Sequence, residues 1–217
     1  MILPAACGLP RDPEGTLDRV RGGTMRVGIV AAEPWTSVSP EGPSGAEVDL
    51  LRRLASELDA AIKWTEGSEE ELLTALQQRE LDAVIGGLTE DNPWSGAVAF
   101  TRPYDTTRVL VGVPPGSALP EDLDGLRVRA REGTDVPGLV EEAGGIAVRV
   151  PGLGPGAPAA GPDFELGSLG LALTDLELRT TRHVMALPAG ENAWIVHVER
   201  FLGRDPELAD RLLEEHA

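Results

Sequence analysis

Short apolar runs alternate with amphipathic segments through the first half of the chain. Residues 25–30, 61–64 and 82–87 are mostly apolar segments of strand length, each with one charged residue, and the last of them ends in two glycines. Between these runs, residues 45–58 carry apolar side chains on one helical stripe, and residues 68–76 begin with a serine and a glutamate spaced as a capping box. This β-α-β-α-β order predicts a parallel sheet with helices on its faces.

Two loops follow the carboxyl ends of strands in this predicted sheet. Residues 31–44 follow the first strand and contain Glu33, Pro34 and Trp35. Residues 87–96 follow the third strand. Ligands of parallel sheets bind outside the carboxyl ends of the strands, so a ligand site is expected at these two loops.

The second half of the chain predicts another α/β unit. Its expected elements are strands at 109–113, 126–130, 146–150 and 183–187, a helix from Thr134 to Ala143, and two closing helices, one over 191–202 and one capped by Asp205. Residues 151–162 are rich in proline and glycine and are expected to be irregular. The alternation of strands and helices favours the same fold class in both halves.

Charge and motif content exclude several classes of function. The formal net charge is −17 and the isoelectric point is near 4.5, so the surface repels nucleic acid and anionic lipid. His183, His197 and His216 are scattered, and no signature of a metal site or an activated nucleophile occurs. We therefore expect no metal, no cofactor and no catalytic residue.

The first 24 residues predict a flexible tether behind a lipid attachment site. Residues 8–23 show no periodic pattern and contain several prolines and glycines. Residues 3–8 (Leu-Pro-Ala-Ala-Cys-Gly) resemble a lipobox, and Cys7 is the only cysteine. We expect Cys7 to be lipidated, with an export signal encoded upstream of Met1. The alternative is an incidental cysteine in a disordered tail.

Five motifs follow one another in residues 26–113. They are Glu33–Trp35 (Glu-Pro-Trp), Gly45–Leu50 (Gly-Ala-Glu-Val-Asp-Leu), Leu72–Leu76 (Leu-Leu-Thr-Ala-Leu), Leu81–Thr89 (Leu-Asp-Ala-Val-Ile-Gly-Gly-Leu-Thr) and Phe100–Tyr104 (Phe-Thr-Arg-Pro-Tyr). Their order and spacing resemble the first lobe of the type II periplasmic solute-binding proteins, the family that includes the polar amino-acid receptors. The resemblance implies an α/β fold, a two-lobed type II clamp that closes on its ligand.

The second lobe resembles the family less closely. Gly133 and Thr134 are similar to a family glycine–threonine pair at a helix N-terminus, where N–H groups face the ligand. Residues 151–158 stand in place of a family helix, which implies that the second lobe is shortened. Asp163 and Glu165 fall where the family places an acid that holds the ligand's amine, and the alternative is a solvated loop.

Two substitutions in the ligand motif bear on the charge of the ligand. The family pattern Gly-x-Thr-x-Thr-x-x-Arg holds a ligand carboxylate, whereas Asp91 occupies the second threonine position here and Trp94 the arginine position. Together with Trp35 and Glu33, these residues suit a cation, which an indole face stabilises. The alternative is that Trp94 packs against the lobe and that Arg102 or Arg108 replaces the missing arginine. The expected ligand-binding residues are Glu33, Trp35, Thr89, Asp91, Trp94, Arg102, Thr134 and Asp163.

The resemblance implies a division of the chain and a function. Expected boundaries are a lipobox and tether over 1–24, lobe 1 over 25–108 plus 189–217, lobe 2 over 114–180, and hinge segments at 109–113 and 181–188. The implied function is that of an extracytoplasmic, monomeric solute-binding protein of an ABC importer, lipid-anchored or periplasmic, which gives a small polar solute to permease subunits and is not an enzyme. The alternatives are a sensor or accessory lipoprotein and a dehydratase-like enzyme on the same fold.

Overall fold

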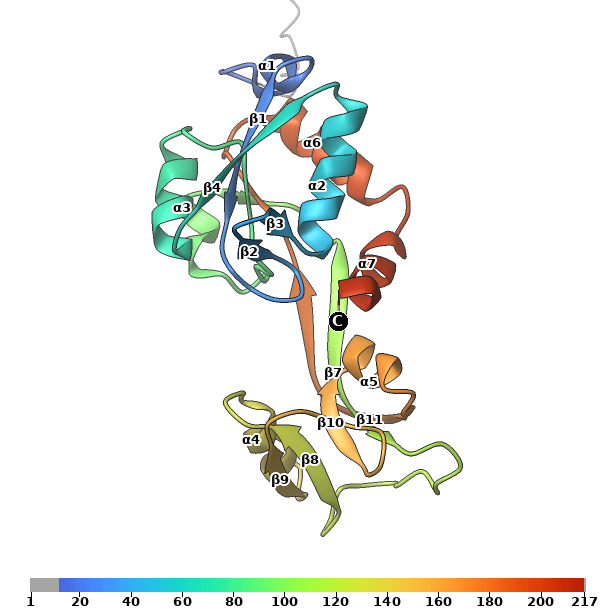
Figure 1. The fold of residues 1–217 in the computed structure, drawn as a ribbon. Helices are drawn as coiled ribbons and strands as arrows, with labels where there is room; N and C mark the ends of the chain where they lie inside the picture. The colour runs from blue at the N-terminus through green and yellow to red at the C-terminus, as the bar shows by residue number, and fades with distance from the viewer. Residues whose placement is uncertain (1–11, 217) are drawn as a thin grey trace, which may run out of the picture. The chain divides into compact units, whose positions relative to one another are not determined.

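A computed structural model describes residues 12–216 of the chain, so the lipidation expected at Cys7 lies outside the described residues. The described part forms two compact units (Figure 1). Unit 1 comprises residues 12–105 and 183–216, and unit 2 comprises residues 106–182. The first lobe therefore contains both ends of the described chain, and the second is inserted into it.

The sheet of unit 1 contains the three strands expected from the apolar runs. β1 (Thr24–Ile29) lies between β4 (Ala61–Glu66) and β5 (Ala83–Ile85), and it pairs with both in parallel, with Val27 opposite Trp64 in β4. Two short antiparallel strands, β12 (Ala186–Leu187) and β6 (Ala99–Phe100), complete the order β4-β1-β5-β12-β6. The prediction of a parallel sheet is confirmed for β1, β4 and β5.

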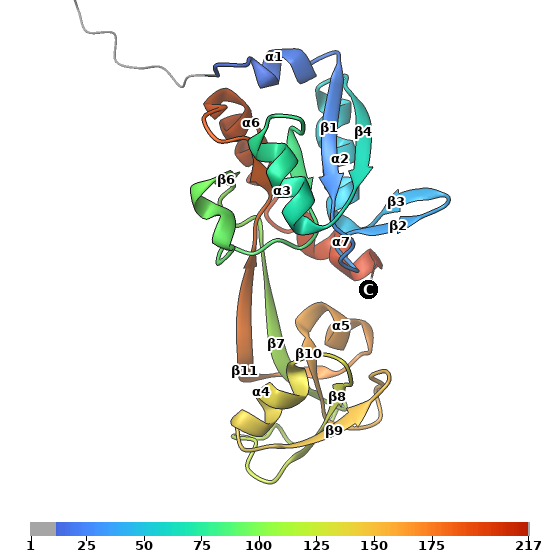
Figure 2. The ribbon, with the colours of Figure 1, turned by 90° about the vertical axis from the view of Figure 1, so that its left-hand side faces the viewer.

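Helices cover both faces of this sheet. The helices are α2 (Ala46–Glu57), α3 (Glu69–Gln77), α6 (Asn192–Leu202) and α7 (Leu208–His216). Figures 1 and 2 show α3 on one side of the sheet and α2, with α7 packed on it, on the other. The expected capping box of α3 is present, because Ser68 and Glu71 each accept a hydrogen bond from the other's backbone N–H.

The segment expected to be a tether is folded onto unit 1 where the structure describes it. Residues 16–20 form the short helix α1 (Thr16–Val20), whose Thr16 and Val20 side chains are buried, and α1 packs against α6. Arg19 is ion-paired with Asp82, and the buried carboxylate of Glu191 accepts the N–H of Thr16 at 3.1 Å. The interpretation as a tether is therefore wrong for residues 12–23. An ion pair and hydrogen bonds hold this segment on unit 1, and such contacts leave no apolar periodicity in the sequence.

Unit 2 is built on a second five-stranded sheet. The strand order is β11 (Ala172–His183), β7 (Asp105–Val113), β10 (Ala159–Pro162), β8 (Arg127–Arg131) and β9 (Ile146–Val150). α4 (Val136–Glu142) packs on one face and α5 (Asp163–Ser168) on the other. β10 was expected to be irregular, but it pairs in parallel with β8 and antiparallel with β7.

The connection from β9 to β10 passes over β8 without a helix. Parallel strands are usually joined by about a dozen residues or more that include a helix, whereas residues 151–158 suffice here. A Cβ atom at Gly154 would lie 3.9 Å from the guanidinium of Arg129, so the segment runs over the arginine-bearing face of β8. This short crossover stands where the family resemblance implies a helix.

Of the two crossings between the units, one precedes the expected hinge segment 109–113 and the other lies within the expected segment 181–188. They fall at 105–106 and at 182–183. Val109 to Gly112 pair with β10 and therefore belong to unit 2, while Ala186 pairs with Val84 and belongs to unit 1. The hinge role of 109–113 and 181–188 stays a prediction, with the boundaries corrected in this way.

Candidate functional site

The loop that carries Trp35 is fixed by the start of α2. A small hairpin of β2 (Ser37–Ser39) and β3 (Gly42–Ser44) follows the loop, and the N–H of Glu47 donates to the carbonyl oxygen of Trp35 at 3.0 Å. Gly45, at φ 119°, passes so close that a Cβ atom there would lie 2.4 Å from the same oxygen. The residue before α2 therefore has to be glycine for Trp35 to take its place.

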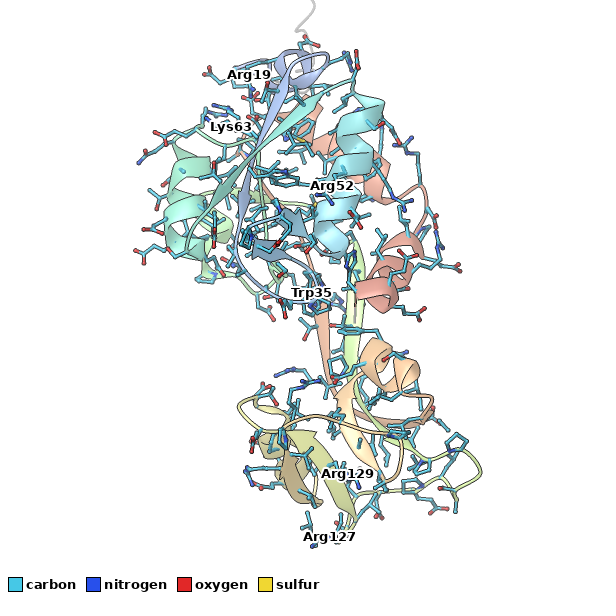
Figure 3. All side chains as sticks on the ribbon, in the orientation of Figure 1. Arg19, Trp35, Arg52, Lys63, Arg127 and Arg129 are labelled. Carbon is cyan, nitrogen blue, oxygen red and sulfur yellow. The ribbon has the colours of Figure 1, made fainter. Side chains whose placement is uncertain are left out.

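The ring of Trp35 packs on a glycine and against a histidine. A Cβ atom at Gly87, which has a φ of 65°, would come within 3.2 Å of the indole, so the ring packs on the glycine backbone. On the same indole, the His183 ring lies with its centroid 4.6 Å away and a tilt of 31°. His183 Nδ1 is 3.3 Å from the carbonyl oxygen of Gly87. Figure 3 shows Trp35 at the end of unit 1 to which β1 runs, as expected for a ligand site of a parallel sheet.

The carboxylate of Glu47 lies beneath this aromatic pair and is completely buried. Its Oε2 accepts the N–H groups of Gly86 at 2.7 Å and Gly87 at 3.0 Å, and its Oε1 accepts the hydroxyl of Tyr104 at 2.6 Å. Burial raises the pKa of Glu47, although these three hydrogen bonds oppose the rise. Burial and then the neighbouring carboxylate raise the pKa of Tyr104 well above its ordinary value, so the phenol stays protonated and donates.

His183 should make unit 1 less stable in mild acid. Burial lowers the pKa of His183 below its ordinary value near 6.5, against the hydrogen bond to Gly87, so the folded imidazole stays neutral where the unfolded one gains a proton. The stability linked to this group is complete above the unfolded pKa and is lost as pH falls through the window below about 6.5. We expect the stability advantage of the wild-type chain over His183→Phe, measured by urea unfolding, to be smaller at about pH 5 than at about pH 7.5. A difference that grows on acidification would contradict this assignment.

Four expected residues lie on the loops of unit 1, with different surroundings. Glu33 is exposed and accepts the Ser37 hydroxyl at 2.9 Å. Thr89 forms a bridge with His183 and so adjoins the aromatic pair, while Asp91, two residues further on, is exposed. The structure thus brings Trp35 and Thr89 together through His183.

Trp94 does not stand free on the loop, as the cation hypothesis required. Asn92 caps the 3₁₀ turn η1 (Pro93–Gly96) by accepting the Trp94 N–H at 3.0 Å, and the half-buried indole packs against a hydrophobic cluster that includes Leu72 and Leu73 of α3. The ring is only partly buried against this cluster. The arrangement favours the alternative in which Trp94 packs against the lobe, and its role as a ligand contact stays a prediction.

Arg102 does not replace the missing arginine of the motif. Its guanidinium is 3.3 Å from the carboxylate of Glu199 on α6, and its side chain is 76 % exposed. Together with Tyr104 it lines a cavity of about 290 Å³ beside the α6–α7 turn, with Pro103, Leu202, Gly203 and Pro206 completing the wall. Its assignment as a ligand contact therefore receives no support from its surroundings.

The expected residues of unit 2 are engaged with arginine side chains or with the backbone. Asp163 is 3.2 Å from the guanidinium of Arg108, and Glu165 is ion-paired with Arg131. Thr134 is exposed and donates to the carbonyl oxygen of Arg131 at 2.8 Å, and α4 begins only after it. A ligand amine would have to compete with arginine for both acids of this unit.

Three residues of the site escaped the sequence interpretation. Glu47 and Tyr104 stood within recognised motifs but were taken as marks of the family, and His183 was placed in a strand without a role. An acidic residue in the apolar first turn of α2 was the available signal for Glu47, because a carboxylate on a buried stripe needs donors. Among residues 12–216, no group of three His, Cys, Asp or Glu side chains is placed to hold a metal ion.

Curated proteins with related sequences include arginine-binding proteins and a longer enzyme. The chain is 30 % identical over 115 residues to the L-arginine-binding protein of Pseudomonas aeruginosa, covering 51 % of this chain and 44 % of that protein. It is 30 % identical over 91 residues to ABC transporter arginine-binding protein 1 of Escherichia coli, covering 42 % and 37 %. A membrane-bound lytic murein transglycosylase F of Vibrio campbellii is 27 % identical over 140 residues, covering 62 % and 26 %. Each match spans less than half the length of the relative.

Solved structures share the fold over nearly the whole chain. An ancestral cationic amino acid solute binding protein matches with a TM-score of 0.71 at 21 % identity, covering 93 % of this chain and 99 % of that one. The unliganded open L-cystine solute receptor of Neisseria gonorrhoeae gives 0.70 at 16 %, covering 92 % and 97 %. An ancestral cyclohexadienyl dehydratase gives 0.66 at 17 %, covering 93 % and 95 %. The fold is thus the two-sheet α/β fold of periplasmic amino-acid-binding proteins.

The family follows from a match along most of the sequence. Residues 25–211 match the model of the bacterial extracellular solute-binding proteins, family 3. This chain belongs to that family, and the resemblance stated from the five motifs is confirmed. In residues 12–216, no helix has the length and apolar character needed to cross a membrane.

Proposed function

We propose that this chain captures a small amino-acid-like solute with a cationic side chain and delivers it to the permease of an ABC importer. The observation that supports a ligand site most directly is the placement of Trp35 on Gly87 at the carboxyl ends of β1 and β5. The proposal includes export from the cytoplasm, a lipid anchor at Cys7, a monomeric state and no catalytic activity. The description of the family as extracellular solute-binding proteins favours export from the cytoplasm.

Two observations favour a cationic solute. The chain carries a formal net charge of −17, and the exposed acids Glu33 and Asp91 lie on the same two loops as Trp35 and Thr89. Relatives named for arginine match the chain at 30 % identity. Trp94 is not counted among these groups, because its ring packs against the apolar cluster of unit 1. An indole face and nearby carboxylates are the groups that attract a guanidinium or ammonium.

The solute class is tested by titration with ligands that differ in charge. Calorimetry with L-arginine, its neutral analogue L-citrulline and L-glutamate should give the order of affinity arginine, citrulline, glutamate. Trp35→Ala is expected to raise the Kd for L-arginine at least about tenfold, which corresponds to about 1.4 kcal/mol of lost stacking and cation–π energy. Tightest binding of L-glutamate would contradict the cationic preference.

A second tryptophan of unit 1 supplies the control. Trp64 is half-buried like Trp35, but it lies in β4 away from the two loops. Trp64→Ala should leave the Kd for L-arginine within about threefold of the wild-type value, because it alters packing and not the ligand loop. An equal loss of affinity in both variants would show that Trp35 acts only through folding.

The second candidate is a dehydratase-like enzyme. An ancestral cyclohexadienyl dehydratase shares the fold at a TM-score of 0.66, but at 17 % identity this shows the fold alone. Incubation with a cyclohexadienyl acid and detection of a dehydrated product distinguishes turnover from binding. Uptake of labelled L-arginine by cells with and without the gene distinguishes an importer from a sensor, since a sensor leaves uptake unchanged.

A further inference from the structure

Glu47 connects three segments of unit 1 that meet at the candidate site. Its backbone N–H binds the Trp35 carbonyl, its Oε2 binds the N–H groups of Gly86 and Gly87, and its Oε1 binds the Tyr104 hydroxyl. One buried residue thus reaches the loop after β1, the loop after β5 and the segment that leads into β7. We propose that Glu47 is the positioning residue that sets Trp35 and the Gly86–Gly87 loop for the solute, an inference that rests on the proposed function.

The contacts of the glycine loop show why the carboxylate has this effect. Gly86 and Gly87 both have positive φ values, 145° and 65°, and consecutive N–H groups in such a turn converge on one acceptor. Glu47 occupies this anion-binding turn. With the turn held, the Gly87 carbonyl faces Nδ1 of His183 and the Gly87 backbone supports the Trp35 ring. Loss of the acceptor would release both supports of the indole.

The occupied turn also bears on how the solute is bound. Since Gly86 and Gly87 already donate to Glu47 at 2.7 and 3.0 Å, a solute carboxylate does not receive these two N–H groups. The negative charge sits at the start of α2, where the helix dipole and the three donors stabilise it. The loop therefore offers the solute the indole face, and its N–H groups remain internal.

The test compares isosteric and truncated variants by two independent measurements. Glu47→Gln keeps one oxygen for the two glycine N–H groups, and its amide can donate to Tyr104, so its Kd for L-arginine should stay within about threefold of wild type. Glu47→Ala removes the acceptor and should raise the Kd at least about tenfold. In ¹H–¹⁵N spectra without ligand, the Gly86 and Gly87 amides and the Trp35 indole should shift in Glu47→Ala and stay close to wild type in Glu47→Gln.

Glu191 provides a matched control for the loss of a buried carboxylate. It is equally buried in unit 1, yet it binds the N–H groups of Glu14 and Thr16 and the side chain of Arg79, away from the loops. Glu191→Ala should lower the melting temperature without moving the Gly87 amide, the Trp35 indole or the Kd. Tyr104→Phe, which removes one of the three donors, should give an intermediate spectral shift and keeps the test open if Glu47→Ala does not fold.

The two measurements separate the positioning role from the proposed function. Unchanged Gly87 and Trp35 resonances in Glu47→Ala, or in Tyr104→Phe if the alanine variant is unfolded, would overturn the positioning role whatever the solute. Equal spectral shifts in Glu191→Ala would overturn it as well, since the effect would then be general destabilisation. Expected spectral shifts together with no binding of L-arginine by the wild-type chain would support the positioning role and reject the solute.

Discussion

Replacing Asp82 by alanine is expected to lower the free energy of unfolding of unit 1 by about 3 kcal/mol. The side chain is completely buried and accepts the N–H of Arg26 at 2.8 Å and its guanidinium at 2.6 Å, and Arg19 of α1 is ion-paired with it. Truncation leaves these donors unsatisfied. We place the loss at the low end of the range for buried ion pairs because both arginines are partly exposed and can turn toward water.

Fluorescence-detected urea unfolding measures this loss in unit 1 directly, because all four tryptophans lie in that unit. Burial alone would raise the pKa of Asp82, but the hydrogen bonds from Arg26 and Arg19 hold it below its ordinary value. The stabilisation is thus present above the unfolded pKa near 4 and is lost as pH falls through the lower folded pKa. Glu214→Ala, at an exposed position of α7 in the same unit, should cost less than about 0.5 kcal/mol. A similar cost for both variants would reject the assignment.

Truncating Trp194 to alanine should be at least as costly, about 3–5 kcal/mol. The indole is completely buried on α6, and its Nε1–H donates to the carbonyl oxygen of Asp82 at 2.7 Å. The variant loses a large apolar side chain, creates a cavity and leaves that carbonyl without its donor. Trp194→Phe, which keeps most of the volume and loses the hydrogen bond, should cost about 1–2 kcal/mol in the same unfolding experiment. A cost below about 1 kcal/mol for Trp194→Ala would mean that α6 does not anchor unit 1.

The strands and helices of unit 1 were predictable because each carries a local signal. β5 is a continuous apolar run and β1 is apolar apart from Thr24 and Arg26, and the burial of β5 and of residues 27–29 explains that pattern. α3 begins at a capping box that depends only on Ser68 and Glu71. These features depend on residues that are neighbours along the chain, so they can be predicted from the sequence alone.

Two elements, α1 and β11, were missed, and the first of them depends on distant residues. α1 has one buried aliphatic side chain, Val20, and is held by ion pairs and hydrogen bonds to Asp82 and Glu191 that no local pattern displays. β11 alternates charged and apolar side chains over Ala172–His183, yet it was not recognised as a strand, since the expected irregular region preceding it obscured where a strand begins. Tertiary contacts define α1, whereas the alternation in β11 is itself a local signal of a strand.

The candidate site likewise contains residues that the sequence predicts and residues that it does not. Trp35 was predictable because an aromatic residue stood in a loop at the carboxyl end of a strand, and its position there follows from sheet topology. The packing of Trp94 was not predictable, because counting positions along a motif cannot show that Asn92 and Pro93 start a turn that places the ring against the apolar cluster. His183 reaches Trp35 only after the chain has passed through the whole of unit 2 and returned, which no pattern within 31–96 reveals.

The crossover over residues 151–158 covers one face of β8 without a helix, whereas α4 covers the other face. Val128 and Ala130 of β8 face the apolar cluster under α4, so Arg127 and Arg129, shown in Figure 3, point to the opposite face. A right-handed crossover from β9 to β10 must pass over that same face. We expect this connection to accept an insertion. A longer crossover would add a layer over the face of β8 that carries the arginines, and the strands would keep their positions. Until such a layer is added, the arginines keep this face of β8 polar, which disfavours the packing of a second sheet on it.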